Sequence, residues 1–120
     1  MASPINGHIL TGQYGERLAQ QYLQQQGYSI QERNYRHKRA EIDIIAKKDN
    51  VLVFVEVKTR TTDKFGFPEE AVSARKEEML LGAAEAYILA TGWEQDIRFD
   101  IMAVTLTVPP TIEHFEDAFY

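Results

Sequence analysis

The 120-residue sequence has no cysteine, only three histidines, and no apolar run longer than the five residues 51–55. A chain without cysteine forms no disulfide framework, and so little histidine argues against a tetrahedral zinc site. A membrane-spanning helix needs about 20 apolar residues. The first residues carry no basic stretch before an apolar core, so we expect no secretion signal. These absences favour a cytoplasmic protein without a membrane partner.

Positive charge is also scarce, and its distribution is uneven. The formal net charge is -5, yet residues 31–64 hold nine Lys or Arg against six acids, and the remainder holds four against twelve. Binding to nucleic acid requires bases that neutralise phosphates. The basic excess in the middle of the chain therefore predicts modest affinity for nucleic acid there. The sequence contains no internal repeat, no glycine-rich phosphate loop and no Ser/His/Asp order typical of a hydrolase triad.

Composition and periodicity predict one α/β domain over residues 1–120. Residues 1–10 lack periodicity and are expected to fray. The remaining pattern predicts a helix over 12–26, strands over 28–35, 41–47 and 51–57, a helix over 74–91, a long strand over 97–108 and a short edge strand over 112–115. This αβββαβ order favours a mixed sheet flanked by helices. Because the second helix is a crossover, the strands on either side of it are expected to be parallel.

The strand 51–57 carries two charges that need an explanation. Glu56 and Lys58 are two residues apart, so they project to the same face of an otherwise apolar strand. Removing ions from water costs several kcal/mol each unless they are paired or bind a metal. The alternative without a functional role is an ordinary Glu–Lys pair on a solvated sheet face.

A tight turn brings a second carboxylate toward this strand. If the loop is only Asp49 and Asn50, Asp43 lies opposite Glu56, and Glu41 lies opposite Lys58. Two carboxylates about 5 Å apart repel each other by about 3 kcal/mol at an effective dielectric constant of about 20. A divalent cation would turn this repulsion into binding.

Oxygen ligands of this kind suit a hard cation such as Mg2+. The carbonyl of Val57 is a possible third ligand beside Asp43 and Glu56. A metal held by two carboxylates next to the ammonium of Lys58 suits phosphodiester hydrolysis, because the metal polarises the phosphate and acidifies a water.

These residues resemble a known signature. Asp43 followed by Glu56-Val57-Lys58 on a hairpin is similar to the PD-(D/E)xK motif of the restriction-endonuclease-like superfamily. More narrowly, residues 12–118 resemble the YraN family of bacterial proteins, through Gly15-Glu16, Glu41-Ile-Asp43, Val53 to Arg60, Phe65-Gly66 and Arg98-Phe-Asp100. The sequence departs from the pattern at Ala40, where the family usually has glycine, and at Ile42, where the superfamily signature is named for proline.

The resemblance implies a restriction-endonuclease-like core similar to that of archaeal Holliday junction resolvases, with a magnesium-dependent nuclease site. It carries over Asp43 and Glu56 as metal ligands and Lys58 as the catalytic lysine. It also implies that Glu16 is an acidic residue approaching from the first helix. Spacing alone favours reading Glu16 as a solvated acid stabilised by the helix dipole, and the resemblance brings the two readings to parity.

Several bases are candidate contacts to nucleic acid. Arg36 to Arg39 forms a basic connection, and Thr59 to Pro68 forms a polar loop that either touches substrate or only connects two elements. Lys76 in the first turn of the second helix indicates an anionic neighbour, either Glu69 or Glu70 or the site itself. The candidate set is Arg36, Lys38, Arg39, Arg60, Lys64 and Lys76.

Two functions remain open from the sequence. The first is a nuclease that uses Mg2+ or Mn2+ to cleave DNA, with branched or junction DNA as a candidate substrate and a homodimer required for paired incisions. The second is a non-catalytic nucleic-acid-binding or assembly module that keeps the fold and a vestigial site.

Overall fold

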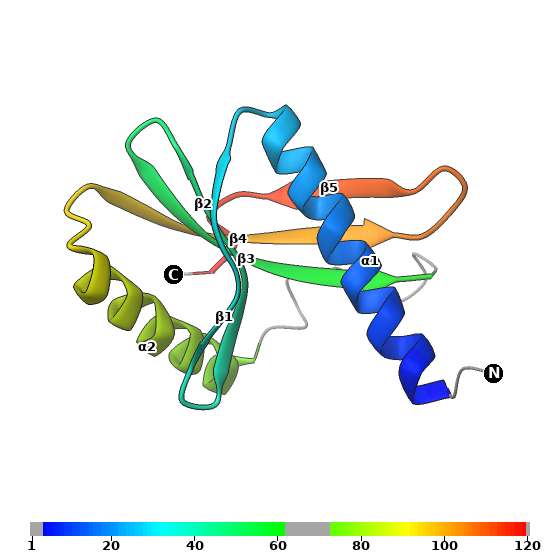
Figure 1. Cartoon of the computed structure of the whole chain (residues 1–120), viewed down its shortest axis with the longest axis horizontal. Coiled ribbons are helices and arrows are strands. Elements are labelled where there is room, and N and C mark those ends of the chain that lie inside the picture. Colours follow the sequence, from blue (N-terminus) through cyan, green and yellow to red (C-terminus); the bar gives the residue numbers. More distant parts are fainter. Residues whose placement is uncertain (1–3, 62–72, 120) are drawn as a thin grey trace.

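The computed structural model describes residues 4–61 and 73–119, with side chains described from residue 10 onward. Within these limits the chain forms two helices and one five-stranded mixed sheet of order β1-β2-β3-β4-β5 (Figure 1). The helices are α1 (Pro4–Gln25) and α2 (Ala74–Thr91), and the strands are β1 (Ser29–His37), β2 (Ala40–Lys48), β3 (Val51–Arg60), β4 (Asp96–Thr105) and β5 (Thr111–Phe115). The predicted mixed sheet with flanking helices is confirmed.

The β2–β3 hairpin forms as its sequence predicts. Lys48 pairs with Val51 across the two-residue loop, and Asp49 takes the left-handed conformation at φ 56°. The predicted register holds through five pairs as far as Ile44 opposite Val55. β3 then pairs with β4 in parallel, which confirms the crossover connection through α2.

The two faces of the sheet bury two separate apolar cores. α1 contributes Ala19 and Leu23 to the core that contains Val53 and Val55. α2 contributes Leu80, Ala83, Ala84 and Tyr87 to the core that contains Leu52 and Phe54. Side chains of β3 therefore alternate between the α1 face and the α2 face, as the pleat of a strand requires. Figure 1 shows the helices on opposite faces of the twisted sheet.

The ends of α2 match the sequence signals. Ser73 is the N-cap, and its hydroxyl accepts a hydrogen bond from the Lys76 N–H at 3.2 Å. Gly92 ends the helix in the left-handed conformation at φ 70°, which glycine adopts without steric cost.

The predicted start of α1 is wrong. The helix begins at Pro4 rather than Gly12, so the segment expected to fray is helical from residue 4. Proline fits the first turn of a helix, because its missing N–H has no partner there in any case. The other end follows the prediction, with Gly27 at φ 94° just beyond the last helical residue.

Three strand ends also differ from expectation. β1 continues to His37 and β3 to Arg60, so Arg36 and Arg60 are strand residues rather than loop residues. β4 ends at Thr105, three residues before the limit predicted from Pro109-Pro110. Pairing with neighbouring strands extends or ends these elements, and a single-sequence pattern does not report it. Neither helix in the described part of the chain combines the length and the apolarity needed to cross a bilayer.

Candidate active site

Glu56 lies at the point where three elements meet. It follows Leu52 and Phe54 on the α2 face of β3, and its side chain is only 7% exposed. Lys76 of α2 places its Nζ 2.9 Å from Glu56 Oε1, and Lys58 of β3 places its own Nζ 3.6 Å from the same oxygen. The other oxygen, Oε2, is buried and has no hydrogen-bond partner among the described residues. One carboxylate oxygen thus contacts both ammonium groups, and no donor from the described residues reaches the second.

Asp43 turns its carboxylate toward β3 just beyond the last pair of the β2–β3 ladder. Its Oδ2 accepts a hydrogen bond from the Val57 N–H at 2.7 Å. Burial raises the pKa of Asp43 to about 8; the charge of Glu56 adds to the effect, and the Val57 hydrogen bond opposes it only in part. The charge of Glu56 therefore acts on Asp43, although the β2–β3 ladder ends at Ile44–Val55, one pair before the predicted pairing of these two residues.

The two lysines respond oppositely to the same carboxylate. Burial lowers the pKa of Lys58 against the opposing charge of Glu56, and the nearby ammonium of Lys76 lowers it further. Burial also acts to lower the pKa of Lys76, but its hydrogen bond to Glu56 and the Glu56 charge raise that pKa above its ordinary value. Lys76 is thus the firmly charged partner, and Lys58 is the one closer to losing its proton. The anionic neighbour expected for Lys76 is Glu56; the alternatives Glu69 and Glu70 lie outside the described residues.

α1 brings Glu16 to the edge of this cluster. Its Oε1 accepts a hydrogen bond from Asn34 Nδ2 at 2.9 Å and lies 3.4 Å from Arg33 Nη2. The charge of Glu16 is among the causes that raise the pKa of Asp43. The hydrogen bond and the ion pair of Glu16 are thus with β1, and its charge acts on Asp43.

Asn34 is the residue that the sequence reasoning missed. It has φ 52° in the middle of β1, a conformation that asparagine tolerates better than most residues. Before it, Arg33 faces α1, and after it Tyr35 packs in the α2 core. The strand therefore changes face at Asn34, and this turns the Asn34 amide toward Glu16. An asparagine inside a strand pattern was the available signal.

The expected pairing of Glu41 with Lys58 is wrong. Glu41 forms an ion pair with Arg36 of the neighbouring strand at 2.9 Å, whereas Lys58 pairs with Glu56. The β2–β3 ladder stops at Ile44, so the predicted register does not extend to Glu41. Beyond that point β2 pairs only with β1, and Arg36 lies directly opposite Glu41.

The other predicted contacts to nucleic acid fall in three places. Lys38 and Arg39 are exposed at the β1–β2 turn, close to Arg36. Arg60 lies at the end of β3, where its Nε donates a hydrogen bond to Thr105 Oγ1 at 3.4 Å. Lys64 lies outside the described residues. Lys76 reaches Glu56 of the carboxylate pair.

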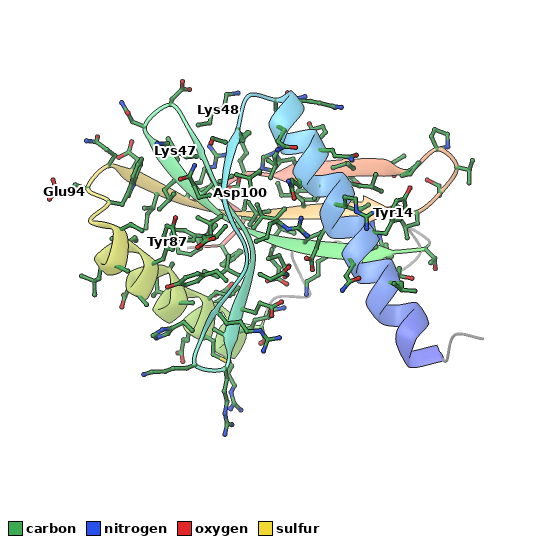
Figure 2. All side chains as sticks on the ribbon, viewed as in Figure 1. Tyr14, Lys47, Lys48, Tyr87, Glu94 and Asp100 are labelled. Atoms are coloured by element: carbon green, nitrogen blue, oxygen red, sulfur yellow. The ribbon has the colours of Figure 1, made fainter. Side chains whose placement is uncertain are left out.

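Asp100 forms a second buried cluster on the α1 face of β4. Arg98 donates to both of its oxygens at 2.8 Å, His114 Nε2 lies 2.7 Å from Oδ2, and the Asp117 N–H donates to Oδ1 at 3.0 Å. Burial acts to raise the pKa of Asp100, but these hydrogen bonds together lower it below its ordinary value. The predicted Arg98–Asp100 pair is confirmed, and His114 completes a saturated network that joins β4 to β5. Asp100 lies in the interior of the molecule in Figure 2.

Fold and site together define an α/β protein with a carboxylate pair and two lysines at the divergence of two central strands. The chain belongs to the uncharacterised protein family UPF0102, whose sequence profile matches residues 15–104. It is 48% identical to a UPF0102 protein of Flavobacterium psychrophilum, over 94% of this chain and 96% of the relative. It is 43% identical to one of Chlorobium chlorochromatii, over 98% and 97%. A third, from Thermodesulfovibrio yellowstonii, is 45% identical over 93% and 97%.

Proposed function

We propose that this protein is a metal-dependent nuclease that hydrolyses phosphodiester bonds of nucleic acid on a restriction-endonuclease-like core. The observation that carries the proposal is the state of the two carboxylates. Glu56 Oε2 is buried without a hydrogen-bond partner among the described residues, and the pKa of Asp43 is raised to about 8. A buried acceptor without a donor costs about 1–3 kcal/mol, and a strained carboxylate pair is a frequent mark of a functional site.

The donor set fits a hard divalent cation such as Mg2+ or Mn2+. Asp43 and Glu56 would supply carboxylate oxygens, and the Val57 carbonyl is the candidate third ligand. The Val57 N–H points to Asp43, and the N–H and C=O of a strand residue project toward the same neighbouring strand. When bound, the metal would polarise the phosphate and acidify a water.

Three further side chains would assist without binding the metal. Lys58, whose pKa is lowered by burial, would orient the attacking water or steady the charge that develops on the phosphate. Lys76 would hold Glu56 in place through its 2.9 Å contact. Glu16 would add its negative charge to the site, since it is among the charges that raise the pKa of Asp43.

The experiment is cleavage of labelled single-stranded, duplex and four-way-junction DNA, with an RNA strand in parallel, in Mg2+ and in Mn2+. We expect Asp43→Asn and Lys58→Ala each to lower the cleavage rate by about 100-fold or more. Lys48→Gln, at the far end of β2, is the matched control and should leave the rate unchanged. Equal rates in wild type and Asp43→Asn would refute the proposal.

One observation favours a second candidate, a non-catalytic module that binds nucleic acid. Among residues 10–61 and 73–119 the structure holds no group of three or more His, Asp or Glu side chains placed to bind one metal ion. The two lysines on Glu56 would then act as permanent counterions. Binding of DNA that survives both substitutions, without cleavage in either metal, would support this candidate.

A further inference from the structure

A groove runs between the β1–β2 turn and the first half of α2. Two cavities of 310 and 470 Å3 lie along it and share four lining residues, Arg39 and Ala40 from the hairpin and Arg75 and Met79 from α2. We call this the hairpin–α2 groove. Figure 1 shows the β1–β2 turn beside the start of α2. Because the cavities share these four residues, they lie next to each other along the groove.

One end of the groove opens at the candidate active site. The smaller cavity is also lined by Lys76, whose Nζ lies 2.9 Å from Glu56. The larger cavity continues past His37 and Lys38 to Gly82. From Lys76 to Gly82 the helix advances about 9 Å, the length of about 2–3 nucleotides of one strand.

The rim of the groove carries more positive than negative charge among the described residues. Two acids also line it: Glu41, which is paired with Arg36, and the exposed Glu78. Lys38, Arg39 and Arg75 are exposed, and none of them forms an ion pair with a residue in the described part of the chain. Arg75 stands in the first turn of α2, where the helix dipole favours acids. Lys76 in the same turn has Glu56 as its anionic partner, whereas Arg75 has no ion-pair partner among the described residues. Three cations against the single unpaired acid Glu78 leave the described rim positive on balance, which is complementary to a polyanion.

The floor of the groove is apolar. Met79 is half-buried against the α2 core, and Ala40 and Leu80 are buried beside it. An apolar floor between cations matches the faces of nucleobases flanked by phosphates. In a duplex these faces are stacked and hidden, whereas an unpaired strand presents them.

We propose that the hairpin–α2 groove binds an unpaired strand of nucleic acid and leads it to the candidate active site. The ligand class rests on the proposed function; the strandedness rests on the basic rim and the apolar floor. It follows that the protein selects single-stranded or tailed nucleic acid over a blunt duplex. His37, at the outer end of the groove, is a further surface against which a base can stack.

The test is fluorescence anisotropy of the whole protein with three labelled DNA probes in EDTA, so that no cleavage is needed. The probes are a 20-nucleotide single strand, a blunt duplex and a duplex with a single-stranded tail. We expect the single strand and the tailed duplex to bind at least about 10-fold more tightly than the blunt duplex. Equal binding of all three probes would overturn the proposal.

Substitutions separate the rim from the floor. Arg39→Gln and Arg75→Gln should each weaken single-strand binding about 3–10-fold and lower the slope of log K against log salt by about 0.7. Met79→Gln should weaken binding about 5-fold and leave the salt slope unchanged. Lys48→Gln, an exposed base at the opposite end of β2 (Figure 2), is the matched control. If the three groove variants all bind like wild type, the groove is not the strand path.

The outcomes also separate this inference from the nuclease. Cleavage that proceeds normally in Arg39→Gln and Arg75→Gln, with binding unchanged, leaves the nuclease standing and removes the groove. Groove-dependent binding of the single strand, with no cleavage in Mg2+ or Mn2+, keeps the groove and removes the nuclease. The proposal would also be overturned if Arg75→Gln weakened single-strand and duplex binding equally and Met79→Gln had no effect. The groove would then be a general phosphate-binding surface.

Discussion

Asp43→Asn is expected to make the protein more stable at pH 8, although it alters a buried residue at the centre of the candidate site. The reason is that burial and the neighbouring Glu56 raise the pKa of Asp43 from 3.8 to about 8. A carboxyl whose pKa is higher in the folded state than in the unfolded state binds its proton more tightly when folded. Its contribution to stability is therefore present at low pH and is lost as the pH rises from about 4 to about 8.

The structure sets an upper limit for this gain in stability and shows that asparagine can keep the local hydrogen bond. A rise of about four pKa units at about 1.4 kcal/mol each gives a ceiling of about 6 kcal/mol, and relaxation of the coupled pair with Glu56 should reduce this to a few kcal/mol. Asparagine keeps an oxygen that can accept the Val57 N–H, as Asp43 Oδ2 does at 2.7 Å. It also replaces a repelling charge with an amide that can donate to Glu56.

The assay is urea unfolding of both proteins at pH 5, 6.5 and 8 without divalent metal. The free energy of unfolding of Asp43→Asn should exceed that of wild type, and the excess should grow with pH. Mg2+ at ten times its dissociation constant should then add about 1.4 kcal/mol to the wild type at pH 8 and far less to the variant. A variant that is less stable than wild type at pH 8, or a difference that does not change with pH, would show that Asp43 is an ionised partner in a structural pair.

Three further substitutions test the surroundings of the site. Asp100→Asn should have the opposite effect and lower the free energy of unfolding by about 3–5 kcal/mol near pH 7. The reason is that hydrogen bonds outweigh burial and lower the pKa of Asp100. The loss measured by urea unfolding should shrink as the pH falls through that pKa. Gly15→Ala should destabilise the fold by about 1–3 kcal/mol, since its Cβ would lie 1.8 Å from the Thr59 hydroxyl oxygen. Gly12→Ala is the control in the same helix: it meets nothing within 4 Å and should stabilise by up to about 1 kcal/mol in thermal unfolding. Lys76→Met should cost about 1–3 kcal/mol near pH 7 by removing the 2.9 Å contact to Glu56, whereas an unchanged midpoint of urea unfolding would contradict that role.

The parts of the fold that the sequence predicts well are those fixed by local signals. The β2–β3 hairpin follows from two apolar runs around Asp49-Asn50, and its register needs only the length of that loop. α2 follows from its apolar spacing between Ser73 and Gly92. The Arg98–Asp100 pair follows from two opposite charges on one strand face.

The parts that the sequence does not predict depend on contacts between elements distant in the chain. The register rule places Glu41 opposite Lys58, but it fails once the β2–β3 ladder ends at Ile44. The change of face at Asn34 depends on a positive φ that one residue type permits but does not require. The partners of Lys76 and His114 lie 20 and 14 residues away, on other elements. Such pairs depend on how helices and strands pack, and periodicity contains no information on this.

The two buried carboxylate clusters of the sheet differ in how completely their oxygens are satisfied. Both oxygens of Asp100 accept hydrogen bonds, from a guanidinium, an imidazole and a backbone N–H, so this cluster is closed and has nothing left to bind. Glu56 has one oxygen shared by two ammonium groups and one that is buried without a donor among the described residues. Folding alone would favour closing both clusters, because an unpaired buried acceptor costs about 1–3 kcal/mol. An open acceptor beside a carboxyl whose pKa is raised to about 8 is therefore the arrangement expected where a ligand completes the set.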